Sequence, residues 1–422
     1  MPFSSLGLSS ALCVAAQAAG FQAPTPVQAG TITAVLQGRD VLVRAPTGSG
    51  KTAAFALPLL QLVVPATHSR GLPRRVQALV LVPTRELAVQ VGDVLKALAQ
   101  RLTPVPKISV VFGGVSINPQ MMGLRGGTDI VVATPGRLLD LVDHNAVHLG
   151  QVRTLVLDEA DRLLEQGFSD ALGRIEALLE PKRQNLFLSA TFAPPVSALA
   201  QQLLHDPAQV DLTEAMQTRP DIAQSAIAVD TRARTQLLRH LIKQYAWSRT
   251  LVFVATKYAA EIVADKLRKG GVNAEPLHGQ LTQGKRSQVL EDFKASRIAV
   301  VVATDLAARG IDVVELPVVV NYDLPRSADD YTHRIGRTGR AGQAGLAVSF
   351  VTAGTEAHWR LIEKRQGLAL DLEAVEGFEP TEVAPHAPER FVDQSGNGGV
   401  KGKRPSKKDK LRAAATSRVP PH

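Results

Sequence analysis

Short runs of Val, Leu and Ile recur along the chain, each separated from the next by a stretch long enough for a helix. These runs lack polar alternation, so they predict strands buried on both faces of a parallel sheet. In the first half the predicted strands are 41–43, 78–82, 108–112, 130–133, 155–157 and 186–188. In the second half they are 251–254, 298–303, 318–320 and 346–351. Each half therefore predicts an α/β domain.

This rhythm of strands and helices breaks at two places, which mark the predicted domain boundaries. Between Asp211 and Ile222 the pattern is lost, which predicts a linker at 213–223 between domains at 30–212 and 224–380. After Gly377-Phe378-Glu379-Pro380 the chain becomes rich in Pro, Gly, Ser and Lys. That composition buries too little apolar surface to fold, so residues 381–422 are predicted to form a disordered basic tail.

Positive charge is concentrated in this tail. Residues 395–422 hold eight basic residues and one acidic residue, and so carry +7 of the formal net charge of +9. Such a run is usually solvated, and a polyanion is its expected partner. Aromatic residues make up only 4% of the chain, so large platforms for stacking bases are not expected.

The cysteine count and the apolar stretches bear on the compartment. Cys13 is the only cysteine, which excludes an intrachain disulfide and a multi-cysteine metal site. The apolar stretch 11–19 lacks the basic start of a signal peptide, because no Lys or Arg precedes Arg39. The longest apolar stretch, 53–66, contains two prolines and is too short to span a bilayer. A cytoplasmic protein with no membrane partner is predicted.

The first candidate for chemistry is Ala45-Pro46-Thr47-Gly48-Ser49-Gly50-Lys51-Thr52, which directly follows a predicted strand. Its glycines allow backbone N–H groups to close around phosphate oxygens. Lys51 offers a positive charge to the outer phosphates, and the Thr52 hydroxyl suits Mg²⁺. A chance glycine turn before a helix is the alternative, and the strand–loop–helix context disfavours it. A phosphate loop is therefore predicted.

An acidic pair, Asp158 and Glu159, ends the predicted strand at 155–157. Beside a phosphate loop, Asp158 would hold the Mg²⁺ shell, and Glu159 would orient and deprotonate the attacking water. Taken alone, the pair could equally be an ordinary exposed pair of carboxylates. Its combination with the loop favours ATP hydrolysis.

A third candidate is His333-Arg334-Ile335-Gly336-Arg337-Thr338-Gly339-Arg340 in the second domain. Arginines three residues apart and flanked by glycines suit the stabilisation of charge on a transferring phosphate. A nucleic-acid patch that contacts phosphates is the alternative. If the first interpretation holds, ATP lies between the two domains.

Together these segments resemble the DEAD-box ATP-dependent RNA helicases over residues 3–380, with the defining motif intact as Asp158-Glu159-Ala160-Asp161. The resemblance implies an α/β fold of two tandem RecA-like domains, with parallel sheets covered by helices. It implies an adenine-recognition segment at 1–29, in which Gln28 bonds the adenine edge and Phe21 or Phe3 packs on its face. The ending at 377–380 and the short basic tail resemble the bacterial RhlE-like subgroup.

The same resemblance implies further roles around ATP. Ser189-Ala190-Thr191 would couple nucleotide state to strand separation through hydrogen bonds from its hydroxyls to Asp161. Asp305 would reach the ATP ribose, and Asp312 would steady Arg337. Arg337 and Arg340 would act as arginine fingers.

For RNA, the resemblance indicates hydroxyls, glycine amides and single arginines at strand ends and helix starts. Such groups bind phosphates and sugars and do not read base edges, so binding without sequence preference is expected. The candidates are Arg85, Gly114, Thr134 and Arg137 in the first domain, and Thr256, Gln283, Arg286 and Thr304 in the second.

Three functional hypotheses follow. The leading one is a monomeric, RNA-stimulated ATPase that uses ATP and Mg²⁺ to unwind short RNA duplexes. The second is an ATP-gated RNA clamp that rarely turns over, which the intact Glu159 and the arginines disfavour. The third is a DNA translocase, which Gln28 and Asp161 disfavour. Single-stranded and short duplex RNA are the expected ligands, and ribosomal precursors or mRNA-decay proteins are typical partners between which the sequence does not choose.

Overall fold

The computed structural model describes residues 2–46, 48–63, 74–212, 222–308, 316–339 and 344–383. The predicted linker up to residue 221 and the predicted tail beyond 383 lie outside these residues, as do Thr47, Asp312 and Arg340. The described chain builds two parallel sheets of seven strands each. We call residues 2–212 the first lobe and residues 222–383 the second lobe.

The first lobe has a sheet in the order β3-β4-β2-β5-β6-β1-β7. Its elements in chain order are η1 (Phe3–Leu6), α1 (Ser10–Ala18), α2 (Pro26–Leu36), β1 (Val41–Arg44), α3 (Lys51–Val63), β2 (Ala78–Leu81), α4 (Arg85–Ala99), β3 (Ile108–Val111), α5 (Asn118–Leu124), β4 (Ile130–Ala133), α6 (Pro135–Asp143), β5 (Thr154–Leu157), α7 (Ala160–Glu165), α8 (Ser169–Glu176), β6 (Gln184–Ser189), α9 (Pro194–Leu203) and β7 (Ala208–Asp211).

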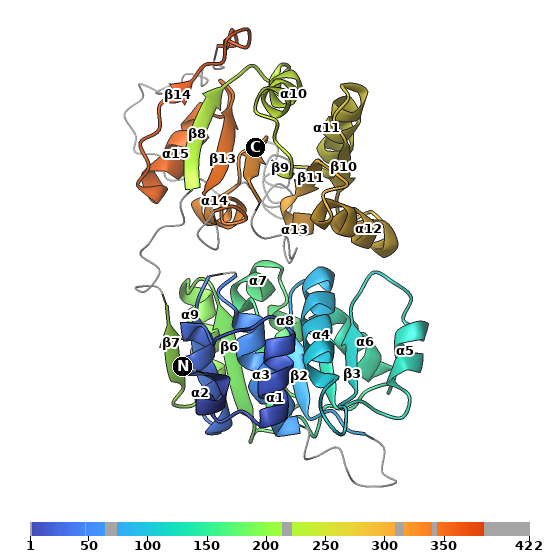
Figure 1. Ribbon diagram of the computed structural model, residues 1–422. Helices are drawn as coiled ribbons and strands as arrows, with labels where there is room; N and C mark the ends of the chain where they lie inside the picture. The colour runs from blue at the N-terminus through green and yellow to red at the C-terminus, as the bar shows by residue number, and fades with distance from the viewer. Residues whose placement is uncertain are drawn as a thin grey trace, which may run out of the picture. The chain divides into compact units, whose positions relative to one another are not determined.

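Helices cover both faces of this sheet (Figure 1). On one face, Val80 and Val156 pack in a cluster with Phe55 of α3 and Val91 of α4. On the other face, Leu138 of α6 and further side chains of α7, α8 and α9 pack on the alternate strand residues. Because both faces are buried, the strands need no polar alternation, which explains their continuous apolar sequence.

The second lobe has a sheet in the order β10-β11-β9-β12-β13-β8-β14. Its elements are β8 (Ile222–Ala228), α10 (Arg234–Gln244), β9 (Thr250–Val254), α11 (Lys257–Lys269), β10 (Ala274–Leu277), α12 (Gln283–Lys294), β11 (Val300–Thr304), α13 (Asp305–Ala308), β12 (Val318–Asn321), α14 (Ala328–Ile335), β13 (Gly345–Val351), α15 (Glu356–Gln366) and β14 (Leu372–Glu373).

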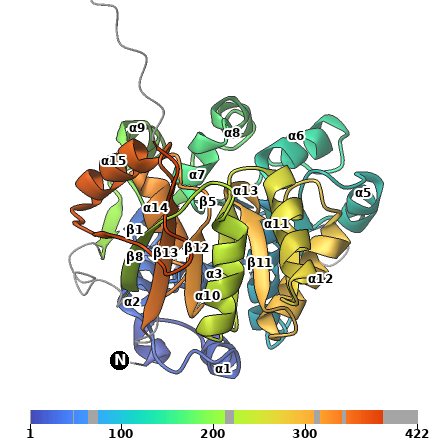
Figure 2. The same cartoon turned by 90° about the horizontal axis from the view of Figure 1, so that it is seen from above.

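This sheet is also covered on both faces. Leu237 of α10 and Val263 of α11 share a cluster with Val252 and Val320, whereas Phe293 of α12 lies in a separate cluster on the opposite face. Figure 2 shows α10 on one side of the strands and α15 on the other. The predicted fold class of two helix-covered parallel sheets is therefore confirmed.

All ten predicted strands are present, with ends that differ from the prediction by at most two residues. Four further strands, β7, β8, β10 and β14, were not predicted. Within each sheet neighbouring strands pair in parallel, so the carboxyl ends of the strands meet at one edge. This carboxyl edge carries every candidate site residue that follows a strand.

Candidate nucleotide and RNA site

The phosphate loop joins β1 to α3 at the carboxyl edge of the first lobe. Gly48 and Gly50 have φ angles of +83° and +92°, which side-chain-bearing residues rarely adopt. Lys51 is nearly buried, and its Nζ donates to the carbonyl oxygen of Ala45 at 2.5 Å. The loop thus bends back on itself and holds its cation inside the turn, where phosphate oxygens would enter.

Gln28, the predicted adenine reader, lies directly against this loop. Its Oε1 accepts from the backbone N–H of Thr25 at 3.0 Å, and its Nε2 donates to the carbonyl oxygen of Gly50 at 3.3 Å. The Thr25 hydroxyl donates to the carbonyl oxygen of Ser49 at 3.1 Å. The start of α2 is therefore bonded to the phosphate loop, and Gln28 is positioned by the loop that binds the rest of the nucleotide.

The two aromatic candidates for the adenine face differ in exposure. Phe3 is almost fully buried in the core on the α3 side of the sheet. Phe21 packs against the same cluster but remains only partly buried. Phe21 is therefore the residue with surface available to a base.

Asp158 and Glu159 follow β5, as predicted. Asp158 is 3% exposed, and burial raises its pKa to about 7, although the positive charge of Lys51 opposes this rise. Glu159 has φ 51° and ψ 51°, in the left-handed region, where a non-glycine residue is strained. A buried carboxyl group and a strained neighbouring carboxylate are features of functional sites rather than of ordinary surface pairs.

The contact between the acidic motif and Thr191 is present, whereas the contact expected of Ser189 is not. The Thr191 hydroxyl and backbone N–H both donate to Oδ2 of Asp161, at 3.0 and 3.2 Å. The Ser189 hydroxyl instead donates to the carbonyl oxygen of Thr191 at 2.7 Å. The Ser189 hydroxyl also accepts from the Thr191 N–H at 3.3 Å, so Ser189 shapes the turn that carries Thr191.

The RNA candidates of the first lobe converge at the ends of β2, β3 and β4. A Cβ atom on Gly114 would lie 1.9 Å from a guanidinium nitrogen of Arg85, so this arginine lies directly against the glycine, whose φ of +78° favours a residue without a side chain. The Gly113 N–H donates to the Thr134 hydroxyl at 3.3 Å, and Arg137 Nη2 donates to the carbonyl oxygen of Val115 at 2.7 Å. Hydrogen bonds thus join the loops after β3 and β4, and Arg85, which follows β2, lies beside them.

Arg137 also offers unused donors. Its Nε and Nη1 are buried and find no hydrogen-bond partner among the described residues, although Oδ2 of Asp140 lies 3.5 Å from Nε. Buried guanidinium donors without partners are uncommon because they lose hydration without compensation. An anionic ligand at this edge would satisfy them.

The RNA candidates of the second lobe follow β9 and β11 or begin α12. Thr256 caps α11, because its hydroxyl accepts from the N–H of Ala259 at 3.1 Å. Thr304 ends β11 and is partly buried. Arg286, in α12, forms an ion pair with Glu86 at 2.8 Å, with both side chains almost fully buried. The hydroxyls are positioned at the carboxyl edge. Arg286 Nη2 has a carboxylate partner, whereas Arg286 Nε and the Oε1 of Gln283 are buried with no partner among the described residues.

Asp305 is held by a residue to which no separate role was assigned from the sequence. Arg334 donates from Nε and Nη2 to both carboxylate oxygens of Asp305, at 2.6 and 2.7 Å. The Arg334 side chain is 3% exposed, and its guanidinium lies 4.9 Å from the ring centroid of Phe253. The spacing of arginines in the 333–340 segment predicted phosphate contacts, but it did not show that the Arg334 guanidinium is buried against Asp305.

Ile335, Arg337 and Thr338 of this segment are also buried, and His333 is partly buried. Arg337 is 8% exposed, and burial lowers the pKa of His333 to about 3, so its imidazole is neutral at physiological pH. The predicted partner of Arg337, Asp312, and the second predicted finger, Arg340, lie outside the described residues.

A large cavity lies away from these residues, at the amino-terminal ends of β2, β4 and β5. Its volume is about 1050 Å³, and its lining includes Arg74, Met121, Gly127 and His148. No predicted site residue lines it. The candidate site is therefore located by the charged residues at the strand ends, and the largest described cavity does not coincide with it.

A phosphate loop, a buried acidic strand end and a second parallel sheet with buried arginines define a two-lobed nucleoside triphosphatase of RecA-like design. Residues 25–199 match the family model of the DEAD/DEAH box helicase, and residues 233–342 match that of the helicase conserved C-terminal domain. The chain belongs to the DEAD-box ATP-dependent RNA helicase family.

Relatives and solved structures agree with this assignment. The chain is 38% identical over 369 residues to the DEAD-box ATP-dependent RNA helicase CshA of Bacillus cereus. This aligned region covers 87% of this chain and 69% of CshA. It is 40% identical to the ATP-dependent RNA helicase DeaD of Buchnera aphidicola, over 88% of this chain and 60% of DeaD. The structure of S. cerevisiae Dbp5 bound to RNA and ADP BeF3 matches with a TM-score of 0.77 at 30% identity, covering 88% of this chain and 95% of Dbp5.

Proposed function

We propose that this protein is an ATP-dependent RNA helicase that binds single-stranded RNA without sequence preference and locally separates short RNA duplexes. The observation that carries the proposal is the end of β5. There a buried Asp158 and a strained Glu159 stand at the same sheet edge as the Lys51 loop. Membership of the family supplies the substrate class.

In the proposed mechanism, Lys51 exchanges the carbonyl oxygen of Ala45 for the outer phosphates of ATP, and the N–H groups of the loop bind the phosphate oxygens. Glu159 accepts a proton from the water that attacks the γ-phosphorus, and ADP leaves. The loop residues 45–52, with Thr47 outside the described structure, form the phosphate contacts.

Magnesium fits this site on the chemistry of its donors. The described residues hold no cluster of three or more metal-ligating side chains, but Mg²⁺ with ATP needs only one or two protein ligands besides the phosphates. Asp158 and the Thr52 hydroxyl would hold it. The ion would neutralise charge on the β- and γ-phosphates. A cation would also favour the ionised form of the buried Asp158 carboxyl.

For the nucleoside, we assign the adenine edge to Gln28 and its face to Phe21, because Phe3 is buried in the core. The Gln28 amide keeps one N–H and one lone pair beyond its two protein contacts, which is enough for adenine. Asp305 is the proposed ribose contact, with Arg334 fixing the direction of its carboxylate.

Arg337 and Arg340 are the proposed arginine fingers, with Asp312 as the proposed support of Arg337. The link from ATP to RNA in the first lobe is assigned to Asp161 and Thr191, whose hydrogen bonds join the acidic motif to the loop after β6. Ser189 supports this link through Thr191.

For RNA, the proposed contacts come from both lobes. The buried, unpartnered donors of Arg137 support a phosphate ligand. A few base-pair steps at about 1.4 kcal/mol each lie within the binding energy of one catalytic cycle, so long processive unwinding is not required. The proposed RNA-binding residues are Arg85, Gly114, Thr134 and Arg137 in the first lobe, and Thr256, Arg286 and Thr304 in the second.

The wider setting is also proposed. No described helix is long and apolar enough to cross a membrane. We place the protein in the cytoplasm as a monomer, with ribosomal precursors or mRNA-decay proteins as candidate partners. The residues 377–380 and the composition of the tail support an RhlE-like subgroup.

The test is the rate of ATP hydrolysis with single-stranded RNA, with single-stranded DNA and without nucleic acid. We expect RNA to stimulate the rate strongly and DNA to do so weakly. A negligible rate with tight, ATP-dependent retention of RNA would replace the enzyme with the clamp. Equal stimulation by DNA would favour the translocase.

A further inference from the structure

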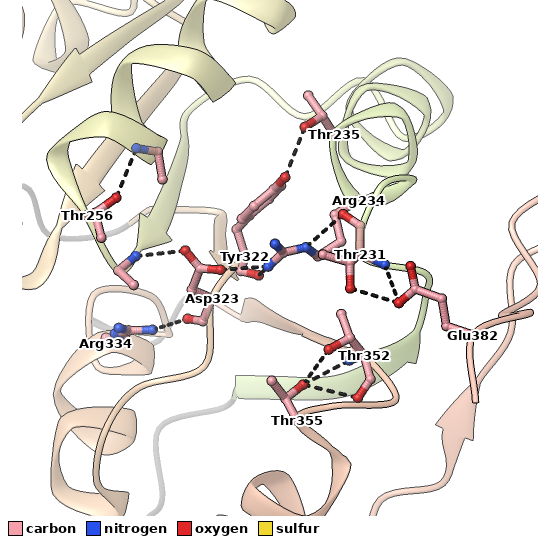
Figure 3. Close-up of polar contacts among 12 residues, drawn as sticks. Thr231, Arg234, Thr235, Thr256, Tyr322, Asp323, Arg334, Thr352, Thr355 and Glu382 are labelled. Carbon is pink, nitrogen blue, oxygen red and sulfur yellow. Dashed lines mark hydrogen bonds and ion pairs between the residues drawn. The ribbon is translucent and has the colours of Figure 1, made fainter. Parts of the chain in front are cut away.

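Asp323, two residues after β12, receives hydrogen bonds from two other segments of the second lobe (Figure 3). Its Oδ2 accepts from the backbone N–H of Ala255 at 2.8 Å, in the loop that precedes Thr256. Its Oδ1 accepts from Arg234 Nη1 at 2.6 Å. The carboxylate therefore joins the loop after β9 to the start of α10, which lie 68 and 89 residues away along the chain.

Arg234 is itself fixed in place, so Asp323 cannot easily turn away. Arg234 Nη1 also donates to the carbonyl oxygen of Tyr322 at 3.0 Å, and its guanidinium lies 4.4 Å from the centroid of the Tyr322 ring. The Tyr322 hydroxyl lies 3.0 Å from the Thr235 hydroxyl. The side chains of Arg234 and Asp323 are only 18% and 22% exposed, which limits screening of their ion pair.

The backbone of Asp323 makes the connection to the nucleotide side. Arg334 Nη1 donates to the carbonyl oxygen of Asp323 at 2.6 Å and to Oδ1 of Asn321 at 3.1 Å. The same guanidinium holds both oxygens of Asp305. One residue thus contacts the RNA-facing loop through its side chain and the arginine behind Asp305 through its carbonyl group.

We propose that Asp323 is a positioning residue that ties the RNA-facing loop 254–256 to the nucleotide-facing pair of Arg334 and Asp305. The two ligands of the second lobe then bind cooperatively, because fixing either end of this chain of hydrogen bonds helps to fix the other. The inference rests on the proposed roles of Thr256 and Asp305, since Asp323 itself touches neither ligand.

An Asp323→Asn substitution isolates this role. It preserves the size of the side chain and the carbonyl contact with Arg334. The asparagine amide has one acceptor oxygen and one donor group, whereas both Ala255 N–H and Arg234 are donors. One of the two contacts therefore becomes donor against donor. The loop then either loses its bond to residue 323 or keeps it on a side chain that Arg234 no longer holds in place.

The experiment measures the affinity of the full chain for a fluorescent oligouridine, with and without Mg²⁺ and a non-hydrolysable ATP analogue. It also measures the affinity for the analogue with and without RNA. The ratio of these affinities gives the coupling between the ligands. We expect Asp323→Asn to reduce the coupling by about tenfold, with each single-ligand affinity changed by less than about threefold.

Two further variants complete the design. Arg234→Met removes the charged partner while keeping length, and should reduce the coupling by about threefold; it carries the test if Asp323→Asn does not fold. Asp292→Asn is the matched control, because the Asp292 side chain is also 22% exposed and accepts from an arginine, Arg297, at 2.6 Å without touching Asp323 or Arg234. It should leave the coupling unchanged.

Wild-type coupling in Asp323→Asn would overturn the proposal. So would an equal loss of RNA affinity with and without the analogue, because that result indicates only a misplaced Thr256. A wild-type protein whose RNA affinity ignores the analogue would instead count against the proposed function itself.

Discussion

The carboxyl edges of the two lobes are built from similar strands but treat charge in opposite ways. In the first lobe, Asp158 is buried with a raised pKa, Glu159 is strained, and Arg137 has buried donors without described partners. In the second lobe, Arg334 satisfies Asp305, Asn321 and the Asp323 carbonyl together. The first edge therefore holds groups that only a ligand would satisfy, whereas the second edge is satisfied around Arg334, although Gln283 Oε1 and Arg286 Nε at the start of α12 are buried without described partners.

This difference indicates a division of labour. Groups held in an unfavourable state gain most from a ligand, so the first lobe is suited to binding phosphates and performing hydrolysis. A network of satisfied hydrogen bonds holds its geometry, so the second lobe is suited to presenting groups at fixed positions. Changes in the first edge should therefore reduce activity more than stability, and changes in the second edge should do the reverse.

The largest effect is expected from Glu159→Gln. Removing the base should reduce the maximal rate of RNA-stimulated ATP hydrolysis by about 10²–10⁴-fold. Because the amide is nearly isosteric with the carboxylate, ATP-dependent RNA binding and thermal stability should remain. Steady-state kinetics and fluorescence anisotropy measure the two quantities.

The exposed Glu180 offers a matched control for this substitution. Glu180→Gln should retain wild-type kinetics. Wild-type turnover in Glu159→Gln would remove Glu159 from the role of base, and a large loss of stability would break the contrast between the lobes.

Arg334→Met tests the second lobe. Removing a buried guanidinium leaves the Asp305 carboxylate and Oδ1 of Asn321 without their Arg334 donors, so the free energy of unfolding should fall by about 3–5 kcal/mol. Urea unfolding measures this loss. Arg326→Met, at an exposed position of the same lobe, should change stability by less than about 0.5 kcal/mol. Equal stability of the two variants would contradict the proposed difference.

The pH dependence of stability should have opposite signs in the two lobes. Burial raises the pKa of Asp158 to about 7, so between its unfolded value of 3.8 and 7 the folded state keeps a proton that the unfolded state releases. Its contribution to stability is lost as pH rises through that range. Burial lowers the pKa of His333 to about 3 from 6.5, so its contribution is lost as pH falls through that range.

Urea unfolding of Asp158→Asn and His333→Gln between pH 4.5 and pH 7, without metal ions, separates the two groups. Relative to wild type, Asp158→Asn should gain stability as pH rises, and His333→Gln should gain it as pH falls. Each difference should change by at most about 1.4 kcal/mol per pH unit. Differences of the same sign would show that the two edges do not treat charge differently.

The smallest effect is expected from the tail, which tests whether the two edges alone account for RNA affinity. Deleting residues 395–422 should weaken RNA binding modestly. It should also reduce the slope of log affinity against log salt by about 0.7 for each RNA phosphate that the tail neutralises. A variant in which the order of residues 395–422 is shuffled keeps the same composition and charge. It should bind RNA like wild type, because the tail is expected to act through its positive charge alone. An unchanged salt slope after deletion would leave RNA binding entirely to the lobes.

The sequence predicts the buried strands well and the edge strands poorly. β7, β10 and β14 lie at sheet edges and carry polar residues or, in Ala274–Leu277, a proline. β8 is next to an edge and is rich in small residues. Such strands have one exposed side and need no continuous apolar run, so the pattern that reveals central strands is absent.

Motif spacing likewise predicts which residues gather at the carboxyl edges, but not where their side chains point. Thr191 meets Asp161 as expected, whereas Ser189 turns to Thr191 instead. The contacts of Arg334 and Asp323 join segments far apart in the chain, and local periodicity contains no information on such pairs. Side-chain direction requires the packed structure.

The left-handed backbone of Glu159 has a consequence for how this protein can change over time. Glycine at this position would relieve the strain and would be expected to make the protein more heat-resistant. It would also delete the proposed base. A laboratory population selected only for survival at high temperature would therefore tend to discard the reaction, and only a simultaneous demand for ATP turnover would keep a glutamate where the backbone least accommodates one.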